Sequence, residues 1–433
     1  MIGFGKLAGR DVDELAPLEH IRNMYRDVRQ RFEDYCAPLE IEDYGLQAVA
    51  ETSPAKWHLA HTSWFFETFI LKPFMPGYQS PNPQFEYLFN SYYNGIGAQF
   101  PRSQRGLLSR PTVADVYDYR HAIDDAMIRL LESGDGGLNT GDLNTIVTRT
   151  ELGLQHEMQH QELFFTDLKY NLALNPLCPV YVDAPGHEEP TRPLALAWTA
   201  QEGGILKMGA DADSSFCFDN ETPRHRVFLE PFELANRPVT NADVLAFIED
   251  GGYQQPALWL ADGWGKVQQE QWQHPLYWRQ QDGEWFEFTL HGLKPLNPYG
   301  IACHLSAYEA DAIARWFDAR LPTEFEWESV AQRQPVKGHF VDSGLYHPES
   351  ADPDTLFGSI WQWTSSAYAP YPGYRPAEGA IGEYNGKFMC NQLVLRGGSC
   401  VTDPRQVRAS YRNFFYPPDR WQFSGVRLAR DAR

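Results

Sequence analysis

The chain has 433 residues, a length that predicts two or three domains, with the 43% hydrophobic and 22% charged composition of a globular protein. Its net charge of −20 argues against a nucleic-acid backbone or an anionic membrane as partner. There is no apolar run of about 18 residues and no basic segment followed by an apolar one at the start, so neither a membrane span nor a signal peptide is expected. Six scattered cysteines without a CxxC pair indicate reduced thiols, and the expected compartment is the cytoplasm.

The first two predicted helices differ in how much of their surface is apolar. Residues 15–39 carry apolar side chains at three- and four-residue steps, the pattern of an amphipathic helix. A second helix is expected to begin near Ser53 and Pro54, a common N-cap and first-turn pair, and to stop at Pro73. Its tryptophan, leucine and phenylalanine residues leave almost no polar face, so it is predicted to be buried.

A long irregular segment, residues 73–111, precedes the next two helices. Its aromatic content argues against disorder, and loops of this length in compact domains are usually functional. A third helix follows Thr112, which forms a near capping box with Asp115, and a fourth spans about residues 142–174. Four such helices predict a four-helix bundle.

The second half of the chain differs from the first in composition and in its predicted secondary structure. Residues 176–200 are proline-rich and lack a helical period, so we interpret them as a linker between domains at 1–175 and 201–433. In the second domain the predicted strands are short, and two brief helices are expected, one capped by Thr240 and one after Ser306. The predicted fold class is therefore α+β with two domains.

Histidines on two of the helices are candidate metal ligands. His156 and His160 are four positions apart, which places both imidazoles on one helix face at a separation suited to one metal ion. Glu157 follows the first histidine as in the H-E-x-x-H helix of zinc proteases, so spacing alone leaves a metalloprotease open. Either His58 or His61 of the second helix can supply a third ligand. Three histidines leave open coordination positions, and imidazole suits zinc, iron, copper and nickel alike.

The irregular segment adds two further candidate groups. Arg102 and Arg105 carry planar guanidinium groups that match a carboxylate, although a solvated surface pair is the plainer alternative. Tyr92 and Tyr93 are adjacent phenols, and a phenol near a metal can donate a proton or be oxidised. Ordinary packing is the alternative for both tyrosines.

Several motifs resemble known families. Residues 218–253 and the segments RLPTEFEWE, GSIWQWTSS, LRGGS and SGVRLAR are similar to the domain of the formylglycine-generating enzyme, which has a C-type-lectin-like core and little regular secondary structure. HLAH and HEMQHQE resemble the ligand motifs of the DinB-like four-helix metal domain. Together and in this order, the two domains resemble the ergothioneine-biosynthesis sulfoxide synthases. Those enzymes use non-haem iron(II) and O₂ to join the sulfur of cysteine or γ-glutamylcysteine to C2 of the hercynine imidazole, and they oxidise that sulfur to a sulfoxide.

The resemblance implies a role for individual residues. It implies an Fe(II) cofactor held by His61, rather than His58, together with His156 and His160. Gln159 matches the glutamine that hydrogen-bonds the hercynine imidazole.

The same resemblance implies two groups of substrate contacts. Arg102 and Arg105 match the R-x-x-R that holds the carboxylate of the thiol substrate. The segment YRNFFYPPDRWQFSGVR matches the lining of the hercynine pocket, where aromatic faces suit the fixed positive charge of hercynine. Its candidate substrate contacts are Asn413, Phe414 and Phe415, with Arg420 a candidate for the thiol substrate.

Departures from the family pattern refine the expected substrate. Phe415 stands where members that use γ-glutamylcysteine have an aspartate, which favours free cysteine. The N-S-Y-Y run resembles the cysteine-using branch, in which a tyrosine near the iron donates a proton; Tyr93 is the first candidate and Tyr92 the second. Cys390 and Cys400 do not match the copper-binding cysteine pair of formylglycine-generating enzymes, so formylglycine formation is not expected.

Alternatives to this interpretation remain open. Selenoneine-forming and ovothiol-type enzymes, the latter making 5-histidylcysteine sulfoxide, share the architecture. A zinc-dependent DinB-type thiol transferase and a non-catalytic lectin-like module belong to other classes. The expected partners are small molecules, namely hercynine, cysteine or γ-glutamylcysteine, and O₂, with no nucleic acid and no membrane.

Overall fold

The computed structural model describes residues 15–133, 140–184, 195–211, 216–348 and 355–432. These residues form two compact units, of which the first runs to Leu174 and also contains the distant segment Arg375–Tyr384. The first unit is helical and the second is a mixture of strands and helices, so the predicted α+β class is confirmed. Within the described ranges, no helix has the length and apolar character needed to cross a membrane. All six cysteines are free thiols.

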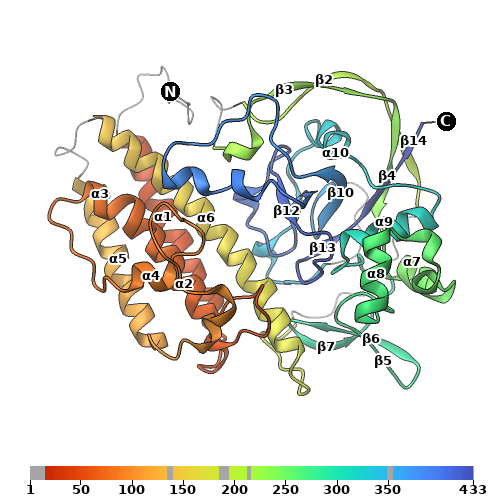
Figure 1. Ribbon diagram of the computed structural model, residues 1–433, viewed down its shortest axis with the longest axis horizontal. Helices are drawn as coiled ribbons and strands as arrows, with labels where there is room; N and C mark the ends of the chain where they lie inside the picture. Colours follow the sequence, from red (N-terminus) through yellow and green to blue (C-terminus); the bar gives the residue numbers. More distant parts are fainter. Residues whose placement is uncertain (1–14, 134–139, 185–194, 212–215, 349–354, 433) are drawn as a thin grey trace. The chain divides into compact units, whose positions relative to one another are not determined.

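Four long helices dominate the first unit, and Figure 1 draws them in red to yellow. They are α1 (Leu15–Cys36), α2 (Ala55–Phe66), α5 (Val113–Ser133) and α6 (Thr140–Ala173). Helix α2 packs against both α5 and α6, and α1 packs against α6. Every residue of α2 is buried, as its sequence predicted. The predicted four-helix bundle is therefore present.

The two ends of α2 differ from the sequence prediction. Pro54 occupies the N-cap position without a side-chain hydrogen bond, and the Ser53 hydroxyl instead accepts from Arg105. Beyond the other end, a π-helical turn and α3 (Lys72–Phe74) carry the helical path past Pro73. Pro73 has no N–H to donate to the Phe69 carbonyl four residues earlier, and this carbonyl instead accepts from Arg149 Nη1 at 2.9 Å.

The chain between α2 and α5 is largely irregular, as predicted. Its helical pieces are the π-helical turn Glu67–Leu71, α3, α4 (Phe85–Phe89) and the 3₁₀ turn Arg102–Leu107. The predicted capping box at the start of α5 is confirmed. The Thr112 N–H donates to Asp115 Oδ2 at 2.9 Å, and the Asp115 N–H donates to Thr112 Oγ1 at 3.2 Å.

The second unit consists of small sheets. Its strands are β1 (Trp198–Gln201), β2 (Gly204–Met208), β3 (His225–Leu229), β4 (Phe232–Pro238), β5 (Trp278–Gln281), β6 (Glu284–Thr289), β7 (Gly292–Pro295), β8 (Gly338–His339), β9 (Phe357–Gly358), β10 (Trp361–Ala367), β11 (Leu393–Arg396), β12 (Asn413–Phe415), β13 (Ser424–Gly425) and β14 (Arg427–Asp431). The strand orders are β1-β4-β14, β12-β11-β10-β13, β5-β6-β7, β2-β3 and β8-β9.

The helices of the second unit are more numerous than expected. They are α7 (Asn241–Glu249), α8 (Ala261–Glu270), α9 (Ala307–Trp316) and α10 (Glu324–Ala331). The predicted caps are confirmed, because Thr240 and Ser306 each accept from the backbone N–H of the third helical residue. The sequence prediction omitted α8 and α10. Helix α10 begins with a capping box between Thr323 and Glu326, a T-x-x-E signal that is readable in the sequence.

The motifs that resemble the formylglycine-generating enzyme lie in the core of the second unit. Arg396 of the LRGGS motif donates to Glu324 at 2.9 Å and to Glu328 at 2.8 Å, and all three side chains are buried. Gly397 has a φ of +107°, and a Cβ there would lie 3.2 Å from Trp327. These motifs therefore define the architecture of the domain.

Part of the predicted linker packs onto the second unit. The N–H groups of Tyr181 and Val182 donate to the Leu290 carbonyl at 2.9 and 3.3 Å. Strand β1 begins at Trp198, inside the range 176–200. The exact domain bounds stay a prediction.

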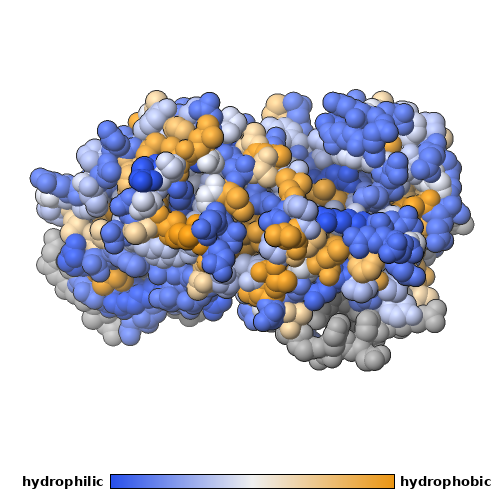
Figure 2. All heavy atoms as spheres, turned by 90° about the horizontal axis from the view of Figure 1, so that it is seen from below, coloured by the Kyte–Doolittle hydropathy of each residue, from blue (hydrophilic) through white to orange (hydrophobic). Residues whose placement is uncertain are grey.

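Apolar side chains also reach the surface, where Figure 2 shows them in separate groups among hydrophilic residues on one face. Scattered apolar exposure of this kind is normal for folded proteins and indicates no particular partner.

Candidate metal centre

Three buried imidazoles gather between α2 and α6. His61 comes from α2, and His156 and His160 come from successive turns of α6. Their candidate ligand atoms all lie within 4.8 Å of one another. Gly153 lies one turn before His156, and a Cβ on it would fall 2.5 Å from the Phe66 ring, so glycine allows the two helices to approach closely. The structure thus brings together the three histidines that the family resemblance selected.

The hydrogen bonds of the imidazoles leave nitrogen lone pairs for a metal ion. His61 Nδ1 lies 2.5 Å from the Phe89 carbonyl oxygen, which can only accept, so Nδ1 carries the proton and Nε2 the lone pair. His61 Nε2 and both ring nitrogens of His156 are buried and have no hydrogen-bond partner among the described residues. Buried polar atoms are rarely left unpaired, so these nitrogens fit a metal that takes imidazole ligands.

Burial also keeps the imidazoles neutral. It lowers the pKa of His156 to about 3, and it lowers the pKa of His61 and His160 well below the usual value, with neighbouring histidines adding to the effect. Neutral imidazole is the form that binds a metal.

Aromatic rings fix the plane of the His61 imidazole. Trp57 stacks on one side at a centroid distance of 4.6 Å and 13°, and Trp64 stacks at 5.5 Å and 14°. Phe65 lies 4.7 Å from the His156 ring. The apolar run WHLAHTSWFF therefore holds His61, the first candidate ligand, in a buried environment.

Glu157 forms ion pairs with two arginines and is not available to a metal ion. Its two carboxylate oxygens accept from Arg29 Nη1 at 2.9 Å and from Arg120 Nη2 at 2.6 Å, and all three side chains are buried. A glutamate held by two arginines cannot act as the general base of a metalloprotease. The H-E-x-x-H interpretation is therefore wrong for this chain.

Arg105 is a buried cation beside the histidine cluster. Its guanidinium lies 3.4 Å from the centroid of Trp57, the ring that stacks on His61. It donates to Ser53 Oγ at 2.9 Å and to Ser91 Oγ at 3.1 Å, and its Nε has no hydrogen-bond partner among the described residues. No carboxylate of the described chain forms an ion pair with it, and burial lowers its pKa well below the usual value.

Arg102 has different surroundings, although both arginines come from the same 3₁₀ turn. It is exposed and donates to the Glu51 carbonyl oxygen. The structure therefore distinguishes the two members of the predicted R-x-x-R pair by their burial.

The two candidate tyrosines stack on each other. The rings of Tyr92 and Tyr93 are 4.6 Å apart at 27°, and their hydroxyl oxygens are 3.5 Å apart. Tyr93 is fully buried and packs against Trp64 at 5.6 Å, which links it to the His61 ring. Burial raises the pKa of Tyr93 well above its usual value, with Tyr92 and Tyr384 adding to the rise, so the phenol keeps its proton.

Tyr384 is a third phenol at the centre, and sequence reasoning missed it. Its hydroxyl donates to Gln159 Oε1, and its ring lies 5.6 Å from His156 at 71°. The preceding Glu383 accepts from the N–H groups of Asn94 and Gly95, which attaches this distant segment to the first unit. The surrounding sequence, AEGAIGEYNG, contains no periodicity or ligand motif that could have revealed the contact.

The predicted contacts of the C-terminal segment all lie in the second unit. Asn413, Phe414 and Phe415 form β12, and Phe414 stacks on Tyr368 at 4.0 Å and 11°. Arg420 donates to Glu309 Oε1 at 2.9 Å, so its charge already has a buried counter-ion. The substrate roles of these residues stay predictions.

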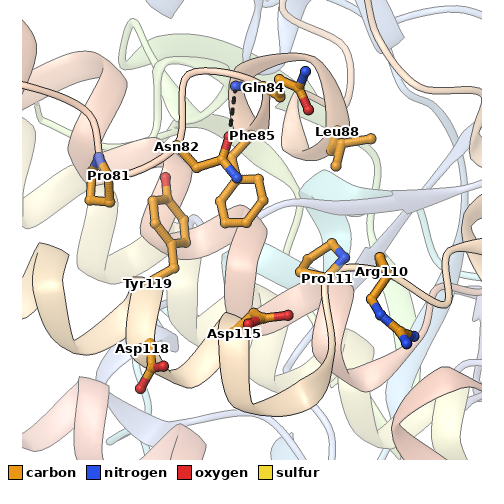
Figure 3. A pocket seen from close by; sticks show the side chains of 10 residues that line it. All are labelled: Pro81, Asn82, Gln84, Phe85, Leu88, Arg110, Pro111, Asp115, Asp118 and Tyr119. Carbon is orange, nitrogen blue, oxygen red and sulfur yellow. Dashed lines mark hydrogen bonds between the residues drawn. The ribbon is translucent and has the colours of Figure 1, made fainter.

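A separate pocket opens between the chain before α4 and the start of α5, as Figure 3 shows. Its volume is about 510 Å³. Its lining residues are Pro81, Asn82, Gln84, Phe85, Leu88, Arg110, Pro111, Asp115, Asp118 and Tyr119. None of the clustered histidines lines it, so it is distinct from the candidate metal centre.

Comparison with known families defines the class of protein first. The DinB superfamily model matches residues 24–164, and the model of the sulfatase-modifying factor enzyme 1-like domain matches residues 197–354 and 337–432. The chain thus combines a DinB-type helical domain that carries a three-histidine cluster with a domain of the formylglycine-generating-enzyme type.

Curated relatives then identify the family. The hercynine oxygenase of Mycolicibacterium thermoresistibile is 31% identical over 426 residues, covering 88% of this chain and 87% of the relative. The hercynine oxygenase of Mycolicibacterium smegmatis is 30% identical over 422 residues, covering 88% and 91%. Ergothioneine biosynthesis protein 1 of Schizosaccharomyces pombe is 26% identical over 58% of this chain and 33% of its own length. The chain belongs to the hercynine oxygenase family.

Proposed function

We propose that this protein is an iron(II)-dependent oxidative enzyme of ergothioneine biosynthesis. In this proposal it uses O₂ to join the sulfur of cysteine to C2 of the hercynine imidazole and yields the sulfoxide. The observation that carries the proposal is the cluster of three neutral, buried histidines in a chain of this family. γ-Glutamylcysteine is the alternative thiol.

The metal would be held by His61, His156 and His160. Three imidazoles leave open positions, as a catalytic metal requires, and they suit iron(II) as well as zinc. When bound, iron(II) supplies the redox chemistry that couples O₂ to the thiol and the imidazole. The remaining steps are the work of this chain's own side chains.

Arg105 is proposed to bind the carboxylate of the thiol substrate. A buried guanidinium without a carboxylate partner in the described chain is costly, and a substrate carboxylate would offset that cost. Arg102, which is exposed, would contribute long-range attraction.

Gln159 is proposed to contact the hercynine imidazole. It precedes the ligand His160 on α6, and its Oε1 accepts from Tyr384. That hydrogen bond would hold the amide in place before substrate arrives. Tyr384 is thus proposed as a positioning residue for Gln159.

A phenol is proposed to deliver the proton that directs the reaction toward C–S bond formation. Tyr93 is the first candidate and Tyr92 the second, and the geometry adds Tyr384. If each of the three phenylalanine variants gave the wild-type ratio of sulfoxide to cysteine sulfinate, a phenol would not be the proton donor.

The hercynine pocket is proposed to draw on Asn413, Phe414 and Phe415, with Arg420 near the thiol substrate. Phe414 lies beside the rings of Tyr368 and Phe388, and the open face of an aromatic ring attracts a quaternary ammonium group. Phe415 brings no charge to the site, which favours cysteine over γ-glutamylcysteine.

One incubation tests the proposal. Protein purified without oxygen is loaded with Fe(II) and given hercynine and air, with cysteine, γ-glutamylcysteine or a selenosugar in parallel. Mass spectrometry is expected to find the hercynine–cysteine sulfoxide as the main product. No sulfur or selenium adduct from any donor would contradict it, and stoichiometric zinc without O₂ consumption would support a DinB-type transferase instead.

A further inference from the structure

His58 is a fourth buried histidine beside the three candidate metal ligands. Its imidazole contacts one of them, His160, and is not itself part of the three-histidine cluster. Its Nδ1 lies 2.9 Å from Nδ1 of His160, and its Nε2 lies 3.1 Å from Asp167 Oδ2. The same carboxylate oxygen accepts from the Ser53 N–H at 2.8 Å. All four residues are buried. They form a hydrogen-bonded chain from the backbone at the start of α2 to a metal ligand on α6.

The proton positions along these hydrogen bonds follow from which atoms can donate and which can only accept. A carboxylate oxygen accepts, so the His58 nitrogen that faces Asp167 carries a proton. In neutral His58 the other nitrogen, Nδ1, then has the lone pair. Because Nδ1 of His160 faces that lone pair, it must be the donor. The proton of His160 therefore lies on Nδ1, and its lone pair lies on Nε2.

We propose that His58 and Asp167 are positioning residues that fix the tautomer of His160 and so make its Nε2 a metal ligand. In the opposite tautomer Nε2 would carry a proton and could not bind a metal. The proposal rests on the three-histidine metal site, and it is independent of which reaction that metal performs. It also explains why the second helix needs two histidines three residues apart: His61 binds the metal, and His58 orients another ligand.

The three ligands differ in how their tautomers are fixed. His61 is fixed by the Phe89 carbonyl, which is backbone and unaffected by substitution of that side chain. His160 is fixed by His58 and Asp167. His156 has no fixing partner among the described residues. Hydrogen bonds of this kind orient metal-binding histidines and raise their basicity, and removing one typically weakens metal affinity by about 10- to 100-fold.

Matched substitutions separate this role from simple packing. His58→Leu fills similar space but removes the acceptor for His160, whereas His58→Gln keeps an amide oxygen that can accept and an amide N–H that can donate to Asp167. Asp167→Leu removes the acceptor at the far end, whereas Asp167→Asn keeps an oxygen for Ser53 and His58.

The test is Co(II) binding by the metal-free protein, followed by visible absorption and by competition with a chelator. The leucine variants are expected to bind about 10- to 100-fold more weakly, with an altered absorption band, while the glutamine and asparagine variants retain most of the affinity. His61→Ala is the reference for the site itself. If it bound Co(II) like the wild type, the metal site would be elsewhere; if it lost binding while folded His58→Leu kept full affinity, the tautomer proposal alone would be wrong.

A second measurement needs no substitution in this series of hydrogen bonds. In the spectrum of ¹⁵N-histidine-labelled protein loaded with Zn(II), a diamagnetic probe, His58 is expected to show a protonated Nε2 and an unprotonated Nδ1. His160 is expected to show a protonated Nδ1. The reverse pattern at either ring would overturn the proposal, even if the leucine variants failed to fold.

Discussion

The surroundings of the histidine cluster and the core of the second unit bury their charged groups in different ways. In the core of the second unit two buried cations are paired with carboxylates, since Arg396 meets Glu324 and Glu328 and Arg420 meets Glu309. In the first unit Arg105, with no carboxylate of the described chain as partner, lies beside histidine nitrogens that have no hydrogen-bond partner there. A satisfied network holds a fold, whereas unsatisfied groups that converge on one point indicate where a ligand binds.

The contrast shows that some family motifs lie in the core of the second unit, whereas others carry the candidate metal ligands. The most specific motifs, such as LRGGS and RLPTEFEWE, belong to the satisfied network of the second unit. The candidate metal centre consists of three histidine side chains on two helices. Substitutions that disrupt one of these groups of residues and leave the other intact therefore test whether the two have separate roles.

Removal of a metal ligand is expected to have the largest effect. His156→Ala should abolish stoichiometric iron binding and sulfoxide formation, because two imidazoles are a poor site for iron(II). His121→Ala is the matched control, since this histidine is exposed on α5. Iron content by elemental analysis and product by mass spectrometry measure both. Full iron occupancy in His156→Ala would refute the ligand assignment.

Breaking the ion-pair network of the second unit is expected to lower the free energy of unfolding and to leave metal binding unchanged. Arg396→Met leaves Glu324 and Glu328 buried with one cation fewer, which typically destabilises by about 3–5 kcal/mol. Chemical denaturation should show this loss, while the affinity of the folded protein for Co(II) should stay unchanged. An equal loss of metal affinity would mean that the two networks are not separate.

Loss of the buried cation in the first unit is expected to weaken thiol binding. Arg105→Leu should raise the KM for cysteine by about 10- to 100-fold, the equivalent of a lost charged hydrogen bond, without altering metal content. Arg102→Leu should change that KM by only a few-fold, because exposed charges contribute little. Steady-state kinetics at saturating hercynine distinguish them, and a reversed order would contradict the proposed role of Arg105.

The smallest effect is expected at the contact that orients Gln159. Tyr384→Phe removes one hydrogen bond and should raise the KM for hercynine by about 2- to 10-fold if positioning is its only task. A change in the ratio of sulfoxide to sulfinate would instead identify Tyr384 as the proton donor. Tyr87→Phe, an exposed tyrosine on α4, provides the comparison variant.

Local patterns were sufficient for the helices and for placing His156 and His160 on one face of α6. The i, i+4 spacing of His156 and His160, the burial of α2 and the Thr112–Asp115 cap are short-range features, and each is confirmed. The choice between His58 and His61 was different, because both lie on the same buried helix. Only the position of α6 decides that His61 meets the cluster.

Long-range contacts account for what the sequence did not reveal. The Ser53 hydroxyl accepts from Arg105 instead of capping α2, because a buried guanidinium needs acceptors more than a helix end does. Glu157 matches a protease motif by spacing, yet two arginines from other helices hold it. Tyr384 reaches the centre from more than 200 residues away in sequence, and no periodicity encodes such a contact.

The most direct test of the account is an anaerobic iron(II) titration of the metal-free wild-type protein and of its His61→Ala, His156→Ala and His160→Ala variants. The account predicts saturable, stoichiometric binding in the wild type and none in the three variants, with His58→Gln close to wild type. Equal iron binding by the wild type and the three alanine variants would contradict the central claim that α2 and α6 together build the metal centre.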